Sequence, residues 1–270
     1  MSELKPLFMK SMKDCVGAET KVAIALSGGK DSTTILFALL ELGITPIAYS
    51  LHVDGNESTD YKIAKQTCKS LGVAFNEVIL PKVADKQRIV DLIVKYDRVN
   101  KVDIECYYPL QLMLDQVKEK ILLVGITAGV MVPLSKKACI HFKHDKDKLN
   151  EWREKDWEYV TKKDFIDLNR FSAIIVRDPF YNRAILDWFK QQSWDSLHKP
   201  NQKQVLIDMF PEMFAKIKTM PQVSMQVGDS GIREIYEPLL LDKELNYRNR
   251  NRVNELYKDI WKRAQHVELL

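Results

Sequence analysis

Ser27-Gly28-Gly29-Lys30-Asp31-Ser32-Thr33 is the most informative stretch of this 270-residue chain, and it directly follows the apolar run Val22–Leu26 (VAIAL). The run before it has the composition of a strand, and the apolar stretch Thr34–Leu42 after it is typical of a helix. A strand, a glycine turn and a helix start bring backbone N–H groups and the positive end of a helix dipole together, which suits a phosphate. The stretch therefore predicts an α/β fold with an anion site after its first strand.

Each residue type in the loop has a physical reason to be there. Two glycines let the backbone approach a phosphate closely, three hydroxyls can donate hydrogen bonds, and a lysine supplies positive charge. Asp31 makes sense in such a loop if its carboxylate holds a Mg²⁺ that bridges to the phosphates. The spacing is not that of Walker-type nucleotide sites, because no glycine stands five residues before Gly29. An ordinary β-turn-α connection, which also favours Gly, Ser and Asp, is the alternative interpretation.

The composition limits the classes of protein to which this chain can belong. The chain is 46% hydrophobic and 29% charged, which is typical of a soluble globular protein. Its net charge of +4 suits an anionic ligand but is too small to indicate nucleic-acid binding by itself. The apolar run Ile121–Leu134 is too short and too interrupted by glycine to span a bilayer, and no apolar leader is present. We therefore expect a cytoplasmic protein without a membrane partner, and its four scattered cysteines indicate reduced thiols.

Strand and helix patterns alternate through the first half of the chain. This order predicts a doubly wound, mostly parallel sheet with the glycine loop at the carboxyl end of its first strand. The second half is helical in pattern and shows no further clear strand, so we expect a helical C-terminal portion. The predicted strands are 22–26, 46–53, 74–80 and 121–126, and the predicted helices are 34–42, 61–71, 85–96, 108–118, 185–192, 203–210, 213–219 and 243–270.

Several segments resemble one known superfamily. Ser27–Ser32 (SGGKDS) resembles the SGGxDS loop of the N-type ATP pyrophosphatases, which split ATP into AMP and pyrophosphate while adenylating a substrate. Ile175–Trp188 (IVRDPFYNRAILDW) resembles the EVRxPFLDxxLxxF segment of asparagine synthetases, and Lys203–Pro211 resembles their KxxLRxxxxxxLP helix. Met225–Gly231 falls where those enzymes carry a phenylalanine-serine-aspartate-glycine loop. The resemblance implies the PP-loop ATPase type of α/β fold.

The resemblance also implies cofactors and roles. ATP and Mg²⁺ would be bound, with Asp31 as the metal ligand and the loop on the β- and γ-phosphates. Lys203 matches a lysine that neutralises negative charge developing on the α-phosphate, although a surface helix lysine is an equal alternative. Residues 1–135 would form the ATP-binding core, and residues 136–270 a mainly helical synthetase-like extension. The residues implied to bind ATP or pyrophosphate are Ser27, Gly28, Gly29, Lys30, Asp31, Ser32, Thr33, Leu51, His52, Val53 and Gly125.

The chain departs from the asparagine synthetase pattern in two places. The family's fourth strand runs into an acidic SGEGSDExFGGY motif, but here the segment Val124–Pro133 keeps Gly125 and contains no acid. Asp31 would then organise the metal alone, unless another loop brings in Asp54, Glu57, Asp178 or Asp229. At the N-terminus, Ser2 stands where those enzymes have the cysteine nucleophile of a glutaminase domain. We expect the amine to come from ammonia in solution, from a separate glutaminase, or from the substrate.

Three functions are compatible with these features. The leading hypothesis is a ligase that adenylates a small-molecule carboxylate, or a similar oxygen, and forms an amide with ammonia or an amine. The second is an enzyme that modifies a base in tRNA or DNA, which would fit the arginine-rich C-terminal segment, although nucleic acid is the less favoured partner. The third is a degenerate, non-catalytic nucleotide-binding protein, suggested by the missing acids.

Overall fold

The computed structural model describes residues 3–134, 138–159, 168–170, 172–220, 228–239 and 247–267. The chain forms two compact units. The first consists of Met1–Ser50, Asp60–Asn76 and Val117–Gln222, and the second of Leu51–Thr59, Glu77–Gln116 and Val223–Leu270. The division at residue 135 that the sequence suggested stays a prediction, and Ser2 lies outside the described residues.

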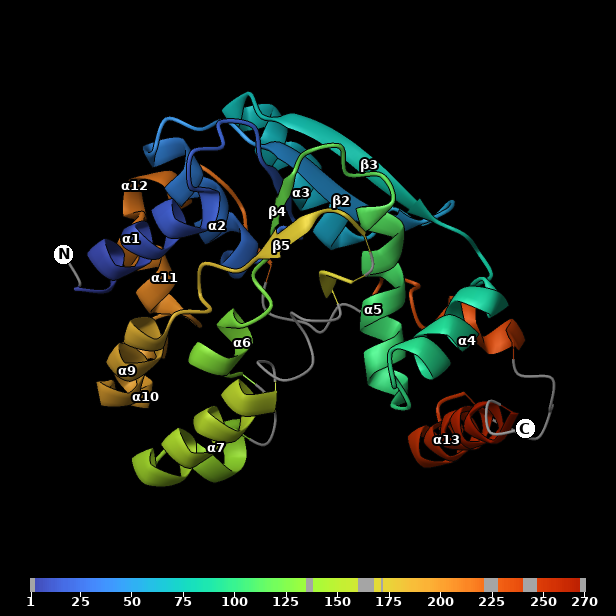
Figure 1. Cartoon of the computed structure of the whole chain (residues 1–270). Coiled ribbons are helices and arrows are strands. Elements are labelled where there is room, and N and C mark those ends of the chain that lie inside the picture. Colours follow the sequence, from blue (N-terminus) through green and yellow to red (C-terminus); the bar gives the residue numbers. More distant parts are fainter. Residues whose placement is uncertain are drawn as a thin grey trace. The chain divides into compact units, whose positions relative to one another are not determined.

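The strands form a single five-stranded sheet in the order β3-β2-β1-β4-β5 (Figure 1). β1 is parallel to both β2 and β4, and β4 is parallel to β5. From β1 the chain adds β2 and β3 on one side and then reverses to add β4 and β5 on the other, so the predicted doubly wound α/β fold is confirmed. The loop after β1 lies at this switch point, where open α/β sheets bind their ligands. The strands are β1 Ala23–Ala25, β2 Ile47–Val53, β3 Ala74–Leu80, β4 Ile121–Leu123 and β5 Ile175–Arg177.

β5 corrects the expectation that the second half contains no strand. It pairs with β4 through three residues, with Val176 opposite Leu122. Only Val176 of the three is buried, so the strand shows neither the alternation of a half-buried strand nor a continuous apolar run. Pairing with an existing edge, rather than local pattern, makes this segment a strand.

The predicted helices are present for the most part, with shifted ends. α5 begins at Lys101 instead of Tyr108, because the Asn100 side chain accepts the Val102 N–H at 3.1 Å and caps the helix there. None of the described helices is long and apolar enough to cross a membrane. Residues 160–167, 221–227, 243–246 and 268–270, which include parts of predicted segments, lie outside the described residues. The α-helices are α1 Leu4–Val16, α2 Lys30–Glu41, α3 Thr59–Leu71, α4 Lys86–Lys95, α5 Lys101–Leu114, α6 Ala128–Met131, α7 Lys146–Tyr159, α9 Arg183–Gln191, α10 Trp194–His198, α11 Gln204–Met209, α12 Pro211–Phe214 and α13 Arg250–Val267, with a π-helix at Ala138–Phe142 and a 3₁₀ helix at Glu234–Leu239.

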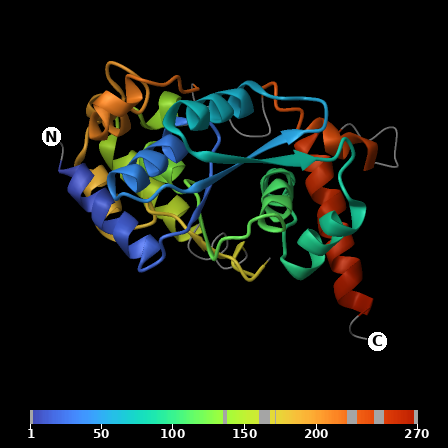
Figure 2. The same cartoon turned by 90° about the horizontal axis from the view of Figure 1, so that it is seen from above.

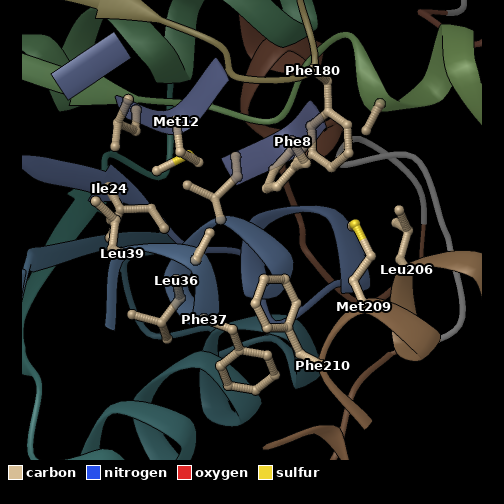
Figure 3. Close-up of a cluster of buried hydrophobic side chains, with 14 of the residues drawn as sticks. Phe8, Met12, Ile24, Leu36, Phe37, Leu39, Phe180, Leu206, Met209 and Phe210 are labelled. Atoms are coloured by element: carbon tan, nitrogen blue, oxygen red, sulfur yellow. The ribbon is translucent and has the colours of Figure 1, made fainter. Parts of the chain in front are cut away.

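The core of the first unit is built around α2. Phe37 is fully buried and lies edge-on to Phe210, with ring centroids 6.1 Å apart (Figure 3). Its ring also packs edge-to-face on Phe214, at 4.9 Å. On the α1 side, the Phe8 and Phe180 rings lie 4.6 Å apart. One continuous apolar core thus contains residues of α1, of α2 and of the segment after β5.

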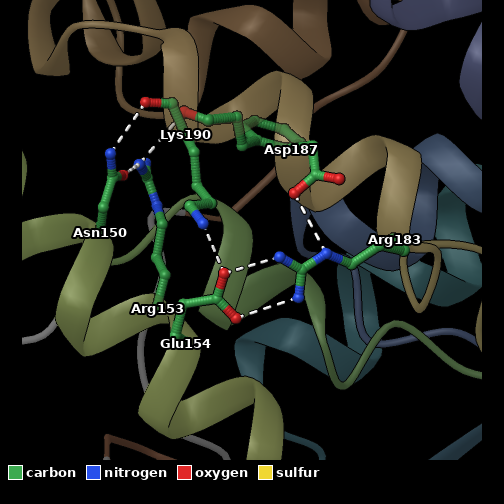
Figure 4. Close-up of polar contacts among 7 residues, drawn as sticks. Asn150, Arg153, Glu154, Arg183, Asp187 and Lys190 are labelled. Atoms are coloured by element: carbon green, nitrogen blue, oxygen red, sulfur yellow. Dashed lines mark hydrogen bonds and ion pairs between the residues drawn. The ribbon is translucent and has the colours of Figure 1, made fainter.

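A second set of contacts joins α7 to α9 in the same unit (Figure 4). Glu154 accepts hydrogen bonds from both terminal nitrogens of Arg183, at 3.0 and 2.8 Å, and from Lys190. The neighbouring Arg153 is fully buried and donates to the carbonyls of Phe189 and Met131, each at 3.1 Å. Burial lowers the pKa of Arg153 to about 10, which leaves it charged at neutral pH. Arg153 therefore ties α6, α7 and α9 together.

In the second unit, α13 packs against α4 and α5 (Figure 2). The Asn254 side chain of α13 accepts the Lys101 N–H at 2.7 Å, at the first turn of α5, and the Trp261 indole donates to Asp97. Tyr257 of α13 is buried. The basic residues of this C-terminal region are exposed; they are Arg248, Arg250, Arg252, Lys258, Lys262 and Arg263.

Candidate active site

The glycine loop connects β1 to α2 in the first unit, as predicted. Gly28 has a φ of +68°, and a Cβ there would lie 2.7 Å from the Asp60 carbonyl oxygen, so only glycine fits this turn. The Ser32 hydroxyl accepts the Ser27 N–H at 3.1 Å and lies 3.2 Å from the Ser27 hydroxyl. Gly29 is the N-cap of α2, which places the loop at the positive end of a 12-residue helix. This is the local geometry of an anion site.

Lys30 and Thr33 occupy the first turn of α2. Burial, and then the positive charge of Lys203, lowers the pKa of Lys30. Thr33 is buried, and its hydroxyl has no hydrogen-bond partner among the described residues. The two residues therefore differ, because Lys30 keeps part of its surface accessible whereas Thr33 faces the interior.

Lys203 meets Asp31 at the loop. Its ammonium donates to both carboxylate oxygens of Asp31, each at 2.5 Å, although the two residues are 172 positions apart. Only 2% of the Lys203 side chain is exposed, against 23% for Asp31. The interpretation of Lys203 as a surface helix lysine is therefore wrong. Lys203 is also the N-cap of α11 and has a left-handed backbone, with φ at +57°.

The segment after β4 packs against the same loop. A Cβ on Gly125 would lie 3.4 Å from the Asp31 Cβ, so this glycine permits close approach to the loop's acid. Two residues further on, the Thr127 N–H donates to Asp178 at 2.7 Å, and the Phe180 N–H donates to the other Asp178 oxygen at 2.8 Å. Burial raises the pKa of Asp178 to about 7, and the nearby charge of Asp31 adds to this effect. Asp178 is thus an acid beside the segment in which the sequence lacks acids.

Leu51, His52 and Val53, which the resemblance implies to contact the adenine of ATP through their backbone amides, belong to the second unit, at the end of β2. His52 is buried, with Nδ1 at 3.0 Å from the Val53 carbonyl oxygen and Nε2 at 3.3 Å from Glu77. Leu51 is half-buried. Asp229, in the same unit, accepts hydrogen bonds from the N–H and hydroxyl of Thr59 at 2.9 and 2.5 Å. The adenine-contacting role of Leu51, His52 and Val53 stays a prediction.

The donor set at the loop fits a nucleotide-bound Mg²⁺ rather than a metal held by protein alone. Among the described residues, no group of three His, Cys, Asp or Glu side chains could hold a metal ion. In nucleotide sites, Mg²⁺ keeps several waters and takes one or two carboxylates plus phosphate oxygens. Asp31, which is partly exposed at the glycine loop, fits that arrangement.

Comparison with known families agrees with this geometry. The family model for asparagine synthase matches residues 3–207, which is well over half of the chain. The chain belongs to the asparagine synthase family. This membership confirms the resemblance to the N-type ATP pyrophosphatases and supports an enzyme that uses ATP. The matched region contains the glycine loop, Gly125, Asp178 and Lys203.

Individual relatives are more distant. The chain is 43% identical over 56 residues to 7-cyano-7-deazaguanine synthase from Polynucleobacter asymbioticus, a match that spans 21% of this chain and 23% of that enzyme. Among solved structures, it is similar to the U34-tRNA thiolase NcsA of Methanococcus maripaludis, with 13% identity and a TM-score of 0.41 over 98% of this chain and 79% of that one. A predicted subunit of tRNA methyltransferase from Methanocaldococcus jannaschii is 17% identical, with a TM-score of 0.34 over 76% of this chain and 93% of that one.

Proposed function

We propose that this protein cleaves ATP between the α- and β-phosphates and transfers AMP to an oxygen atom of its substrate, releasing pyrophosphate. The observation that supports this most is the contact between the buried Lys203 and the partly exposed Asp31 at the glycine loop. Burying an ammonium group is costly, and a lysine held at a phosphate-binding loop can act on charge that develops there. The left-handed backbone of Lys203 supports the same view, since such conformations gather at functional sites.

Each residue of the site would have its own role in the reaction. The loop amides and the first turn of α2 would hold the β- and γ-phosphates, with Lys30 beside them. Lys203 would turn from Asp31 to the α-phosphate, where the transition state gathers negative charge on non-bridging oxygens. Mg²⁺, when bound with ATP at Asp31, would neutralise charge on the departing pyrophosphate. In-line attack by the substrate oxygen then depends on how firmly the loop holds that leaving group.

For the substrate, we propose the oxygen of a nucleobase-like heterocycle, either free or within a nucleic acid. The support is the local match to an enzyme whose product is a deazaguanine that carries a cyano group. A carboxylate that is converted to an amide by ammonia or an amine is the second candidate. The asparagine synthase family match over residues 3–207 favours it.

The test is to incubate the protein with Mg²⁺ and α-labelled ATP and to separate AMP from ADP. Substrate pools of nucleobases, tRNA, DNA, and carboxylates with amines would be added in turn. We expect AMP with a nucleobase-containing pool, and a loss of about 100- to 1,000-fold in Lys203→Met and Asp31→Asn. Lys216→Met, at an exposed lysine of the same unit, is the matched control and should keep full activity.

Each of the other outcomes would indicate a different function. AMP that appears only with the carboxylate and amine pool would support the amide ligase instead. ADP in place of AMP would overturn the assignment of the cleaved bond. ATP binding without AMP in any pool would overturn the enzymatic proposal in favour of a non-catalytic nucleotide-binding protein.

A further inference from the structure

The backbone of Lys203 is in a conformation that lysine normally avoids. Its φ is +57°, and Asp97 is the other non-glycine residue with a positive φ in the described part of the chain. Aspartate tolerates this region through local hydrogen bonds of its short side chain, but lysine has no such compensation. Something outside the residue must therefore hold the Lys203 backbone in place.

His198 makes a direct hydrogen bond with this backbone. The Lys203 N–H donates to the His198 Nδ1 at 3.2 Å, from five residues away. His198 ends α10, is buried, and packs on the Trp194 ring with centroids 4.4 Å apart. Nδ1 can accept a hydrogen bond only when it carries no proton, so the imidazole must be neutral, with its proton on Nε2. Burial, followed by the charge of Lys203, lowers the pKa of His198 to about 4, which agrees with a neutral ring.

We infer that His198 is a positioning residue, whose Nδ1 locks the left-handed backbone of Lys203 so that the ammonium reaches the Asp31 carboxylate at the phosphate loop. Lys203 lies directly before α11, and its amide N–H donates to this ring. Without the link, the backbone can relax to a negative φ, and the direction in which the side chain leaves the backbone changes. The catalytic consequence rests on the proposed function, whereas the placement of Lys203 does not.

The first measurement uses the unmodified protein without nucleotide. The ¹⁵N chemical shifts of the His198 ring at neutral pH should identify the neutral form with the proton on Nε2. A proton on Nδ1, or a charged ring, would overturn the inference, because neither can accept the Lys203 N–H. This measurement involves no variant and no ATP chemistry.

The second experiment compares two substitutions. His198→Asn keeps a side-chain oxygen near the place of Nδ1, and His198→Leu removes the acceptor while filling similar volume. In the nucleotide-free protein, hydrogen exchange of the Lys203 amide and labelling of its ammonium by an amine-reactive reagent are followed by mass spectrometry. We expect both to accelerate about tenfold or more in the leucine variant and to stay near the original values in the asparagine variant. Equal behaviour of the two variants would mean that His198 only fills space.

Catalysis gives a separate readout. If Lys203 acts on the α-phosphate, His198→Leu should lower kcat for AMP formation by up to about 100-fold while KM for ATP changes little, because the loss falls on the transition state. His198→Asn should restore most of kcat. A rise in KM with kcat unchanged would contradict positioning of a catalytic lysine. If the unmodified protein forms no AMP, the proposed function fails, and the exchange and labelling results still decide the role of His198.

Discussion

The buried carboxyl of Asp178 should make the stability of the first unit depend on pH, and the substitution Asp178→Asn should remove this dependence. Two effects compete at this carboxyl. Hydrogen bonds from the N–H groups of Thr127 and Phe180 favour the ionised form, and loss of water favours the protonated form. Only 4% of Asp178 is exposed, and burial is the larger effect, so the pKa rises from 3.8 to about 7.

The sign and size follow from linkage. Between these two pKa values the unfolded chain has released the proton and the folded protein has kept it, so the free energy of unfolding falls as the pH rises. A shift of about 3 units corresponds to about 4 kcal/mol, at about 1.4 kcal/mol for each pH unit. The stability is fully present below the unfolded pKa and is lost as the pH approaches the folded pKa. The asparagine variant carries no charge at any pH and lacks this slope.

The assay is urea unfolding from pH 4 to pH 8, followed by tryptophan fluorescence, because four of the five tryptophans belong to the first unit. The difference in unfolding free energy, asparagine variant minus original protein, should grow by about 4 kcal/mol across this range. Asp208→Asn, at an exposed carboxyl of the same unit, is the control and should show no comparable change. A constant difference would refute the raised pKa. A difference that shrinks with pH would show that the two backbone hydrogen bonds outweigh burial.

Three other substitutions test the loop, the core and the second unit. Gly28→Ala should destabilise the protein by about 1–3 kcal/mol more than Gly72→Ala in urea unfolding, because both glycines have positive φ but only a Gly28 Cβ meets the Asp60 carbonyl. Phe37→Ala should cost about 3–5 kcal/mol by the same assay, because it leaves a cavity under α2. Asn254→Ala should cost about 1 kcal/mol and accelerate hydrogen exchange at the first turn of α5, because it removes the acceptor of the Lys101 N–H.

Local sequence pattern located the strand and the helix on either side of the glycine loop, although α2 begins at Lys30 and not at Thr34 as predicted. β3 has the bounds that the sequence predicted, because proline, glycine and apolar residues mark its ends. α1 and β5 were missed. α1 lies before the first recognisable motif, and β5 has only three residues, so its stability comes from pairing with β4.

Long-range contacts were beyond the reach of the sequence. The resemblance to a known motif pointed to Lys203, but the motif could not say whether the lysine is buried or exposed. Its contact with Asp31 joins residues 172 positions apart. His198 carried no signal at all, since its role depends on a left-handed backbone at Lys203 and on a ring orientation that no local pattern encodes.

The position of Asp178 in the structure changes the interpretation of the missing acids after β4. This carboxyl binds the backbone of the very segment that lacks acids, and its raised pKa keeps it largely protonated below neutral pH. The loop region then contains two basic residues, Lys30 and Lys203, and one partly exposed acid, Asp31. A surplus of basic residues of this kind favours the approach of an anionic ligand. The loss of the family's acids therefore leaves basic residues in the majority around the glycine loop, a charge balance that is compatible with the ATP binding proposed above.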